Sequence, residues 1–518
     1  MTMKIRTSII LTIGILLFSG CTPKTEEKGL SKPNIIFILA DDLGYGELGC
    51  YGQELIETPN IDRMAANGMK FTQHYSGSPV CAPSRCVLLT GLHSGHAYIR
   101  GNDEWKERGM VWDYRAMIAD STLEGQRPIP EDAITIGKLL QSEGYKTGMI
   151  GKWGLGAPNT HGIPTRQGFD FFCGYNCQRQ AHTYYPVHLY LNENRLHLEN
   201  DTVAPNTKLE EGADPLDMGS YSRYNLQTYA PDVMFSEMIR FIEQNREEPF
   251  FFYWASPIPH NPLQAPGKWV DYYVQKFGDE PPYPGDKGYF PHRYPHAAYA
   301  AMVSYLDERV GDLVAKLKEE GLYENTLIIF TSDNGPTYSG GADSQWFNSA
   351  GPFRSDRGWA KGYVHEGGIR VPMVASWPGK IESGTESDHI SAFWDLLPTL
   401  CDVAGADIPE DLDGISYLPE LLGEDDQVEH PFLYWEFPSY NGQQAVRMNQ
   451  WKAIRKDIFE GNLKLELYNL ETDIQEQQNV AEENPEIIRQ MELIMQQEHI
   501  PAEIDRFKME ALGDLINE

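Results

Sequence analysis

The chain has 518 residues, 41% of them hydrophobic and 12% aromatic, so it can bury a sizeable core and a globular fold is expected outside its ends. With 43 basic against 75 acidic residues, the formal net charge of -32 at pH 7 argues against nucleic acid or an anionic membrane surface as a partner. The length suggests two domains, although a large α/β enzyme could use most of the chain in one.

The first residues of the chain predict export and a lipid anchor. Two basic residues precede an apolar run over residues 9–18, and small residues stand directly before Cys21. This pattern is typical of a bacterial lipoprotein signal, so residues 1–20 are interpreted as a signal peptide and Cys21 as the lipidated first residue. The alternatives are an ordinary signal peptide or one membrane span, for which the run is short. Residues 21–31 would be a polar tether, and the protein would be periplasmic or in the outer membrane, held there by its lipid only.

Alternating strands and helices predict an α/β catalytic domain over residues 32–407. The predicted strands are 34–40, 145–151, 250–255, 326–331 and 371–377, and the predicted helices are 59–67, 135–143, 231–245 and 302–317. The first strand is almost continuously apolar, as expected at the centre of a mostly parallel sheet that helices cover on both faces.

The character of the chain changes after about residue 408. Strands are expected there over 432–437, 445–456 and 463–470, followed by a polar helix over 485–499. Residues 408–518 are therefore expected to form a smaller C-terminal subdomain with an antiparallel sheet.

Seven cysteines are few for a disulfide-stapled scaffold. Cys173 and Cys177 are the nearest guess for a bridge, although pairing cannot be assigned from the sequence. A zinc site is not expected, because no second cysteine pair or histidine cluster accompanies them.

Polar clusters follow four of the predicted strands, where open α/β sheets place their ligand sites. They are Asp41 and Asp42, Lys152, His260, and Asp333 and Asn334. The acidic and amide groups offer only oxygen ligands, which suit calcium or magnesium rather than zinc. Each pair alone is more often a turn or cap, but the two pairs together at strand ends favour a metal site.

The segment from Cys81 to Arg85 reads C-A-P-S-R and resembles the C-x-P-S-R motif of type I sulfatases, in which the cysteine is oxidised to formylglycine. The family pattern continues in the L-L-T-G of residues 88–91. Other matching segments, in order and approximate spacing, are residues 34–46, 151–153, 259–262, 332–335 and 361–372. The resemblance spans about residues 32–480 and implies an alkaline-phosphatase-like fold, with a mixed, mostly parallel sheet between helices and a C-terminal subdomain.

The resemblance also implies a calcium site and a set of cations around the sulfate. The implied calcium ligands are Asp41, Asp42, modified Cys81, Asp333 and Asn334. Beside calcium, the implied sulfate-binding cations are Arg85, Lys152 and Lys361. The net charge of -32 argues mildly against a polyanionic substrate. A local pocket of positive charge would neutralise the sulfate in its transition state and so answer that objection.

The implied mechanism needs a maturase that converts Cys81. Hydrated formylglycine has two hydroxyls, one to attack sulfur and one to expel sulfate afterwards, which cysteine cannot do. His260, with Lys361, would protonate the departing sugar oxygen, because an unprotonated alkoxide is a poor leaving group.

One position departs from the family pattern. Most relatives have Lys-Trp-His where this chain has Lys152-Trp153-Gly154, so the histidine that helps the elimination step is absent. His182 is the preferred replacement, and His93, His96 and His161 are alternatives. For any of them a purely structural role is about as well supported.

Substrate specificity is expected to come from long polar and aromatic loops. The candidates for substrate binding are Arg179, Arg354 and Arg357, with Tyr184, Tyr185, Trp346, Phe347 and Trp359 as aromatic residues that could stack on a sugar or simply pack the loops. A sulfated carbohydrate is the expected substrate, with galactose or N-acetylgalactosamine sulfate favoured by overall similarity. The sugar, the sulfated carbon, exo or endo action and the oligomeric state are left open.

Two other functions compete with this interpretation. A phosphatase or phosphodiesterase of the same superfamily would need a Ser or Thr nucleophile and a two-zinc cage, against which Cys81 and Asn334 argue. A lipoprotein that only binds sulfated glycans would fit the loss at Gly154, but the complete set of other catalytic residues argues against it.

Overall fold

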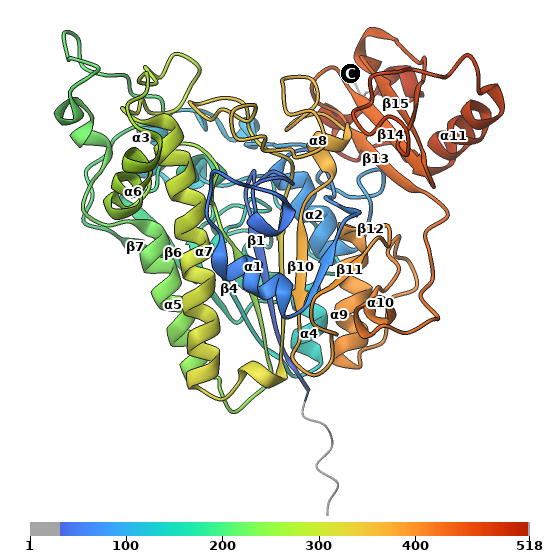
Figure 1. Ribbon diagram of the computed structural model, residues 1–518, viewed down its shortest axis with the longest axis horizontal. Helices are drawn as coiled ribbons and strands as arrows, with labels where there is room; N and C mark the ends of the chain where they lie inside the picture. Colours follow the sequence, from blue (N-terminus) through green and yellow to red (C-terminus); the bar gives the residue numbers. More distant parts are fainter. Residues whose placement is uncertain (1–31, 516–518) are drawn as a thin grey trace, which may run out of the picture. The chain divides into compact units, whose positions relative to one another are not determined.

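A ten-stranded sheet forms the centre of the computed structural model, which describes residues 32–515 (Figure 1). The sheet order is β11-β2-β10-β9-β1-β8-β4-β5-β6-β7. The strands are β1 (Asn34–Ala40), β2 (Met69–Phe71), β4 (Lys146–Lys152), β5 (Phe171–Tyr175), β6 (His188–Leu191), β7 (Asn194–His197), β8 (Phe250–Ala255), β9 (Thr326–Ser332), β10 (Met373–Ser376) and β11 (Thr385–Ser387). The predicted signal peptide and tether, residues 1–31, lie outside the described residues.

The middle of this sheet is parallel and its margins are mixed. β9, β1, β8, β4 and β5 pair in parallel, whereas β10 runs antiparallel to β9, and β6 and β7 add an antiparallel hairpin at the other edge. All five predicted strands are confirmed to within two residues at each end. A further pair, β3 (His74–Tyr75) and β12 (Ser391–Ala392), stands apart from the sheet.

Helices cover both faces of the sheet, as expected from the apolar character of β1. Alternate residues of β1 face opposite sides: Ile35, Phe37 and Leu39 belong to one core, and Ile36 and Ile38 to the other. The first core is closed by α2 (Cys81–Thr90), α4 (Ile136–Ser142) and α9 (Leu396–Ala404). The second is closed by α1 (Pro59–Ala66), α5 (Ala230–Gln244), α6 (Gly267–Phe277) and α7 (Pro295–Glu319). The short helices α3 (Tyr114–Ala119), α8 (Glu366–Ile369) and α10 (Leu418–Leu422) lie in connecting segments.

A four-stranded antiparallel sheet follows towards the C-terminus, as predicted. It consists of β13 (Leu433–Phe437), β14 (Gln443–Met448), β15 (Trp451–Lys456) and β16 (Glu466–Asn469), and α11 (Pro485–Glu498) packs against it. The prediction of one strand over 445–456 is wrong, because Asn449, at φ +51°, turns the chain back and pairs Met448 with Trp451. The boundary between residues 407 and 408 stays a prediction.

The cysteines of the described residues form no disulfide, so the guess that Cys173 bridges Cys177 is wrong. Cys173 lies within β5, where its side chain packs into the core, and Cys177 Sγ lies 3.5 Å from Met117 Sδ. Within residues 32–515, every helix is too short or too polar to cross a membrane.

Candidate active site

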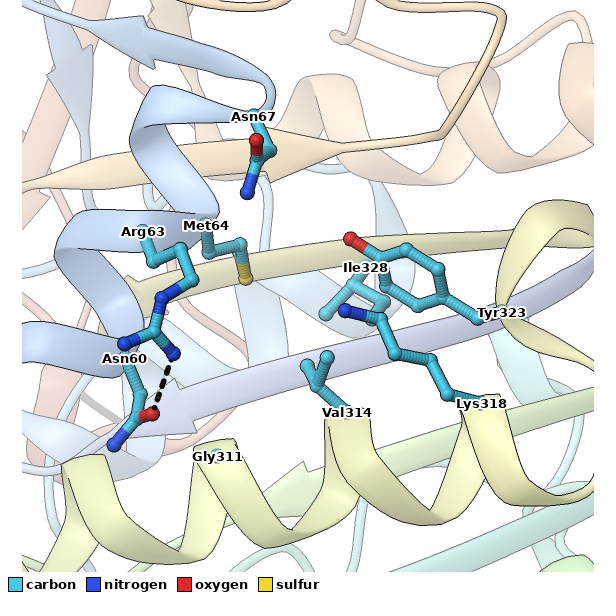
Figure 2. A pocket seen from close by; sticks show the side chains of 9 residues that line it. All are labelled: Asn60, Arg63, Met64, Asn67, Gly311, Val314, Lys318, Tyr323 and Ile328. Atoms are coloured by element: carbon cyan, nitrogen blue, oxygen red, sulfur yellow. Dashed lines mark hydrogen bonds between the residues drawn. The ribbon is translucent and has the colours of Figure 1, made fainter.

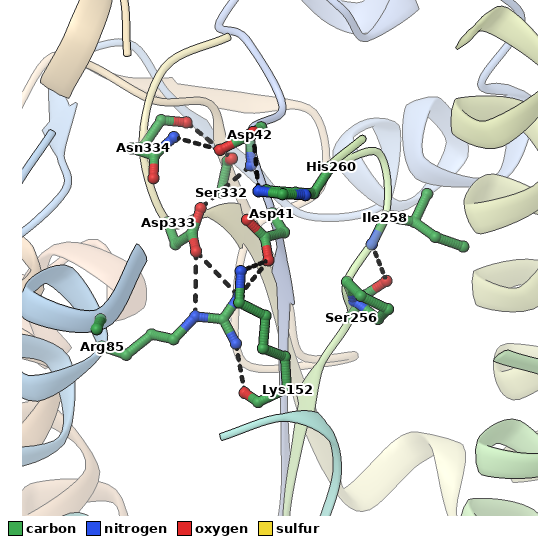
Figure 3. Close-up of polar contacts among 12 residues, drawn as sticks. Asp41, Asp42, Arg85, Lys152, Ser256, Ile258, His260, Ser332, Asp333 and Asn334 are labelled. Carbon is green, nitrogen blue, oxygen red and sulfur yellow. Dashed lines mark hydrogen bonds and ion pairs between the residues drawn. The ribbon is translucent and has the colours of Figure 1, made fainter. Parts of the chain in front are cut away.

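The carboxyl ends of four neighbouring parallel strands bring the predicted site residues together (Figure 3). Lys152 ends β4, while the other polar side chains stand one to five residues beyond β1, β8 and β9. Backbone hydrogen bonds join these loops: Asp41 N donates to Ile258 O and Asp333 N donates to Ala40 O, each at 3.0 Å. The predicted convergence at one sheet edge is confirmed.

Cys81 is the first residue of α2 and is buried at this edge. Pro83 lies in the first turn, where its missing N–H breaks no helical hydrogen bond. Ser84 Oγ accepts from Gly77 N at 3.1 Å and ties the helix to the preceding loop. Burial, with the charge of Asp41, raises the pKa of the Cys81 thiol to about 12, so the unmodified cysteine is not a thiolate nucleophile at neutral pH.

Arg85 holds two of the site's carboxylates. Its Nη2 donates to Asp41 Oδ2 at 3.1 Å and to Asp333 Oδ2 at 2.9 Å, and its Nε also donates to Asp333 Oδ2, at 3.1 Å. Its Nη1 donates to the carbonyl of Lys152. The guanidinium therefore links the ends of β1, β9 and β4 through planar, charge-assisted hydrogen bonds.

Two lysines lie against the same group of carboxylates. Lys152 Nζ is 2.6 Å from Asp41 Oδ2, and Lys361 Nζ is 2.7 Å from Asp42 Oδ2. Burial by itself would lower the pKa of each ammonium, but the carboxylates raise both pKa values above the ordinary one. Together with Arg85, the two lysines give the site three positive charges near Cys81, in a chain whose net charge is strongly negative.

The site also offers oxygen atoms suited to a cation. Within residues 32–515, Asp41 Oδ1 and Asn334 Oδ1 are buried and accept no hydrogen bond. Potential ligand atoms that lie within 4.8 Å of one another come from Asp41, Asp42, Cys81 and His260. Burial, followed by the charge of Asp41, raises the pKa of Asp333 to about 7, which a nearby divalent cation would counteract. Carboxylate and amide oxygens without donors are the ligands that calcium takes, so the residues fit that ion.

His260 and His182 lie together beside the carboxylates. Their rings stack with centroids 5.3 Å apart, and Tyr289 packs edge-on against both, at 5.7 and 5.3 Å. His260 Nδ1 lies 2.6 Å from Asn261 O, which assigns its proton to that nitrogen and leaves Nε2 facing Asp42 Oδ2 at 3.8 Å. Burial, followed by neighbouring positive charge, holds the pKa of both imidazoles well below the ordinary value, so both are neutral. No sequence signal singled out Tyr289.

Gln178, and not His182, fills the space beside Gly154. A Cβ atom at position 154 would lie 2.6 Å from Gln178 Nε2, and Gly154 itself has φ +88°. His182 approaches from the other end of the same 3₁₀ helix, Gln178–His182. The alternative histidines His93 and His96 form a separate cluster with Asp413 and Glu498.

The predicted substrate-binding arginines have different surroundings. Arg179 donates to the carbonyls of residues 111 and 112 and stacks over Trp112. Arg354 forms a bidentate pair with Asp356 and lies 3.8 Å over the Trp359 ring, so both are engaged in loop packing. Arg357 lines a large cavity.

That cavity has a volume of about 840 Å³, and one of its lining residues, Ser339, is bonded to the loop that carries His260. It is lined by the segments 281–296 and 338–357, including Tyr338 and His296. Asn261 Nδ2 donates to Ser339 O at 2.8 Å and so connects its wall to the His260 loop. Two of the aromatic residues that could stack on a sugar differ in exposure. Trp346 is half-exposed and stacks on His296, with ring centroids 4.3 Å apart. Tyr184 is buried, and its hydroxyl donates to His260 O at 2.7 Å.

A second, smaller cavity lies between α1 and α7 (Figure 2). Its volume is about 50 Å³, and Met64, Val314 and Ile328 are among the residues that line it. It contains none of the predicted site residues.

The sequence of the chain matches known sulfatases over most of its length. A sulfatase family model matches residues 33–406, and a model of the C-terminal region of N-sulphoglucosamine sulphohydrolase matches residues 356–500. Arylsulfatase A of Homo sapiens is 33% identical over 453 residues, which cover 81% of this chain and 74% of the relative. N-acetylgalactosamine-6-sulfatase of Canis lupus familiaris is 32% identical, over 81% of this chain and 71% of the relative.

Solved structures show the same fold. The crystal structure of Ps i-CgsB in complex with k-i-k-neocarrahexaose has a TM-score of 0.70 at 27% identity and covers 94% of this chain and 95% of its own. Phosphonate monoester hydrolase of Agrobacterium radiobacter also shares the fold, with a TM-score of 0.62 at 18% identity over 90% of this chain and 96% of its own, so the fold alone does not select sulfate over phosphorus esters. The family matches distinguish these two classes of ester, because they are matches to sulfatases. The chain therefore belongs to the sulfatases, which are sulfuric ester hydrolases with an alkaline-phosphatase-like fold.

Proposed function

We propose that this protein hydrolyses sulfate esters of a carbohydrate, with formylglycine at position 81 and a calcium ion. The observation that carries the proposal is the place of Cys81, buried at the start of α2 within one cluster of carboxylates, lysines and His260. Formylglycine and calcium are typical of the family. The proposed calcium ligands are Asp41, Asp42, modified Cys81, Asp333 and Asn334.

Formylglycine, once hydrated, would supply the nucleophilic hydroxyl, and calcium would supply positive charge that polarises a sulfate oxygen. Lys152 and Lys361 complement the other sulfate oxygens, since their ammonium groups already lie at the carboxylate edge. Arg85 keeps Asp41 and Asp333 in place. These cations are fixed before substrate binds, so little reorganisation is needed when charge develops on the sulfate.

The leaving sugar oxygen would lie on the side of His260. Its Nε2 is the ring nitrogen turned towards the site, and Lys361 contacts the same carboxylate, Asp42. Burial, and after it the charges of Lys361 and Lys152, lower the pKa of His260. An incoming sulfate would offset the charges of the two lysines and so would favour a proton on His260. That proton, or one from Lys361, would pass to the departing oxygen.

We further propose a galactose or N-acetylgalactosamine sulfate as substrate, with the sugar in the large cavity that Arg357 and Ser339 line. Its support is the name of one relative, N-acetylgalactosamine-6-sulfatase, and the neocarrahexaose ligand of one structural neighbour. Arg357 lines this cavity and is the proposed arginine for substrate binding. Arg179 and Arg354 would act by shaping the neighbouring loops.

Export with a lipid on Cys21 belongs to the proposal as well. It rests on the sequence of residues 1–21 and is tested separately from catalysis. We expect the expressed protein to incorporate a labelled fatty acid and the Cys21→Ala variant to lose that label.

The central experiment combines peptide mass spectrometry with a panel of defined sulfated and phosphorylated monosaccharides. After co-expression with a formylglycine-generating maturase, position 81 should carry the aldehyde, and sulfate rather than phosphate should be released. Cys81→Ala should abolish release. Cys86→Ala is the matched control, because Cys86 is buried on the same helix but packs into the core. Full activity with unmodified Cys81, or in Cys81→Ala, contradicts the proposal.

A further inference from the structure

The side chain of Gln178 occupies the place that Gly154 leaves open, two residues along the chain from Lys152. A Cβ atom on Gly154 would come within 2.6 Å of Gln178 Nε2, 2.9 Å of its Cγ and 3.0 Å of its Cδ. The whole side chain of Gln178 thus packs over this glycine, two residues beyond Lys152. A larger residue at position 154 would be strained by the positive φ and would have to displace the side chain of Gln178.

The amide of Gln178 is buried but incompletely paired. Only 4% of the residue is exposed, and within residues 32–515 its Nε2 finds no acceptor. Buried donors without a partner are uncommon and generally have a water, an ion or a ligand as the missing acceptor. The amide therefore has hydrogen-bonding capacity that the described part of the chain does not use.

The backbone of Gln178 is held in position from behind. Its N–H donates to Gln126 Oε1 at 3.1 Å, and Gln126 Nε2 donates to Glu104 Oε2 at 2.8 Å. Gln178 begins the 3₁₀ helix whose last residue is His182, stacked on His260. This short helix therefore runs from Gly154 to His260, and His260 belongs to the cluster that contains Cys81.

We propose that the Gln178 amide binds a non-reacting oxygen of the sulfate group through its free N–H. The inference rests on the proposed function and adds a sulfate-binding residue to it. A sulfate oxygen is a strong acceptor, so it meets the need of the unpaired donor. An amide neither gains nor loses a proton near neutral pH, so Gln178 contributes binding, and a proton acceptor for the elimination step must come from another residue.

The test measures the binding of inorganic sulfate and the kinetics of the calcium-loaded, formylglycine-bearing protein. Binding is followed by calorimetry and by competitive inhibition, and KM is measured with the sulfated sugar that the panel identifies. Gln178→Ala should weaken sulfate binding and raise KM roughly tenfold, as expected for one lost hydrogen bond to a charged group. Gln178→Glu has nearly the same shape but replaces the donor with a carboxylate, so its sulfate binding should weaken at least as much.

Gln180→Ala is the matched control. Gln180 lies on the same 3₁₀ helix and is equally buried, but its Nε2 lies 2.8 Å from His188 Nε2, away from Gly154. This variant should lower the melting temperature and leave sulfate binding unchanged. Sulfate binding of native strength in Gln178→Ala, or in Gln178→Glu, overturns the inference. Wild-type protein that binds sulfate but releases none from any sugar would instead contradict the proposed function, and the comparison of variants by calorimetry would still decide the role of Gln178.

Discussion

Arg85 shows that a charged residue of the motif can act on the site instead of on the substrate. The sequence resemblance counts it among the cations that neutralise sulfate, but its guanidinium donates to Asp41, Asp333 and a backbone carbonyl. Removing one member of such a buried group leaves an unpaired charge, which typically costs about 3–5 kcal/mol. Its contacts favour a positioning role, in which Arg85 keeps two predicted calcium ligands at a fixed separation.

Asp333 should couple calcium binding to activity. Asp333→Asn keeps the shape and one oxygen but removes a charge, so we expect calcium affinity and turnover to fall together, each by roughly tenfold or more. Metal analysis and calcium titration of activity check this, and high calcium should restore part of the rate. Two zinc ions per chain in active protein would support a phosphatase mechanism instead.

His182 should assist the elimination step. Its ring is neutral and stacked on His260, so it can accept a proton within the site. We expect His182→Ala to lower turnover on the order of a hundredfold, the usual loss of general-base assistance, and to accumulate sulfated enzyme detectable by mass spectrometry.

His96→Ala serves as its control, since His96 bonds Asp413 in the separate histidine cluster. That variant should lose thermal stability and keep its turnover. Near-native turnover in His182→Ala would refute the assignment.

At the level of elements, α9 begins beside an ion pair, Asp395 and His430, whose charge depends on pH. Asp395, at its start, accepts from Ala392 N and lies 2.7 Å from His430 Nε2. Burial alone would lower the pKa of His430, but Asp395 raises it above the ordinary value of 6.5. The stabilisation is therefore complete below about pH 6.5 and is lost as the pH rises through the folded-state pKa.

His430→Gln should remove this pH dependence. The melting temperature of the wild type should exceed that of the variant by more at about pH 6 than at about pH 9, because the charged pair exists only at the lower pH. Thermal denaturation of both proteins across this range is the measurement. A difference that is constant with pH would show that the hydrogen bond, not the charge, stabilises the contact.

At the level of the whole molecule, the C-terminal sheet supports the loop that carries Lys361. Gln443, in β14, accepts from Val364 N at 3.1 Å and donates to Gly362 O at 2.9 Å. Lys452, in β15, is fully buried and contacts Glu366 Oε1 at 2.8 Å. The smaller sheet therefore holds the backbone next to Lys361, which is a proposed sulfate-binding residue.

Gln443→Ala should reduce kcat/KM roughly tenfold, since it removes two backbone hydrogen bonds of about 1 kcal/mol each beside Lys361. Gln444→Ala is the matched control, because adjacent residues of a strand point to opposite faces and Gln444 bonds Tyr434 and Arg455 instead. The control should lose stability without this loss of activity. Equal kinetics in the two variants would contradict the supporting role.

Much of this architecture could be predicted because its signals are local. Unbroken apolar runs identify β1 and β8 as buried strands, and the residues after them reach the same sheet edge whenever the strands are parallel. The hairpin of β14 and β15 was missed because its side chains alternate through a turn at Asn449 that carries no glycine or proline.

The sequence by itself determined the family, the approximate ends of the five predicted strands of the large sheet and the chemical kinds of side chain at the site, because apolar periodicity and motif spacing are properties of neighbouring residues. Only the tertiary structure decided which side chain lies beside Gly154, since Gln178 and His182 occupy the same short helix and differ only in direction. The same holds for Tyr289, which has no motif and meets His182 only through the path of its loop. The direction of a side chain depends on packing between segments that are far apart in the sequence, and such packing cannot be predicted from the pattern of neighbouring residues.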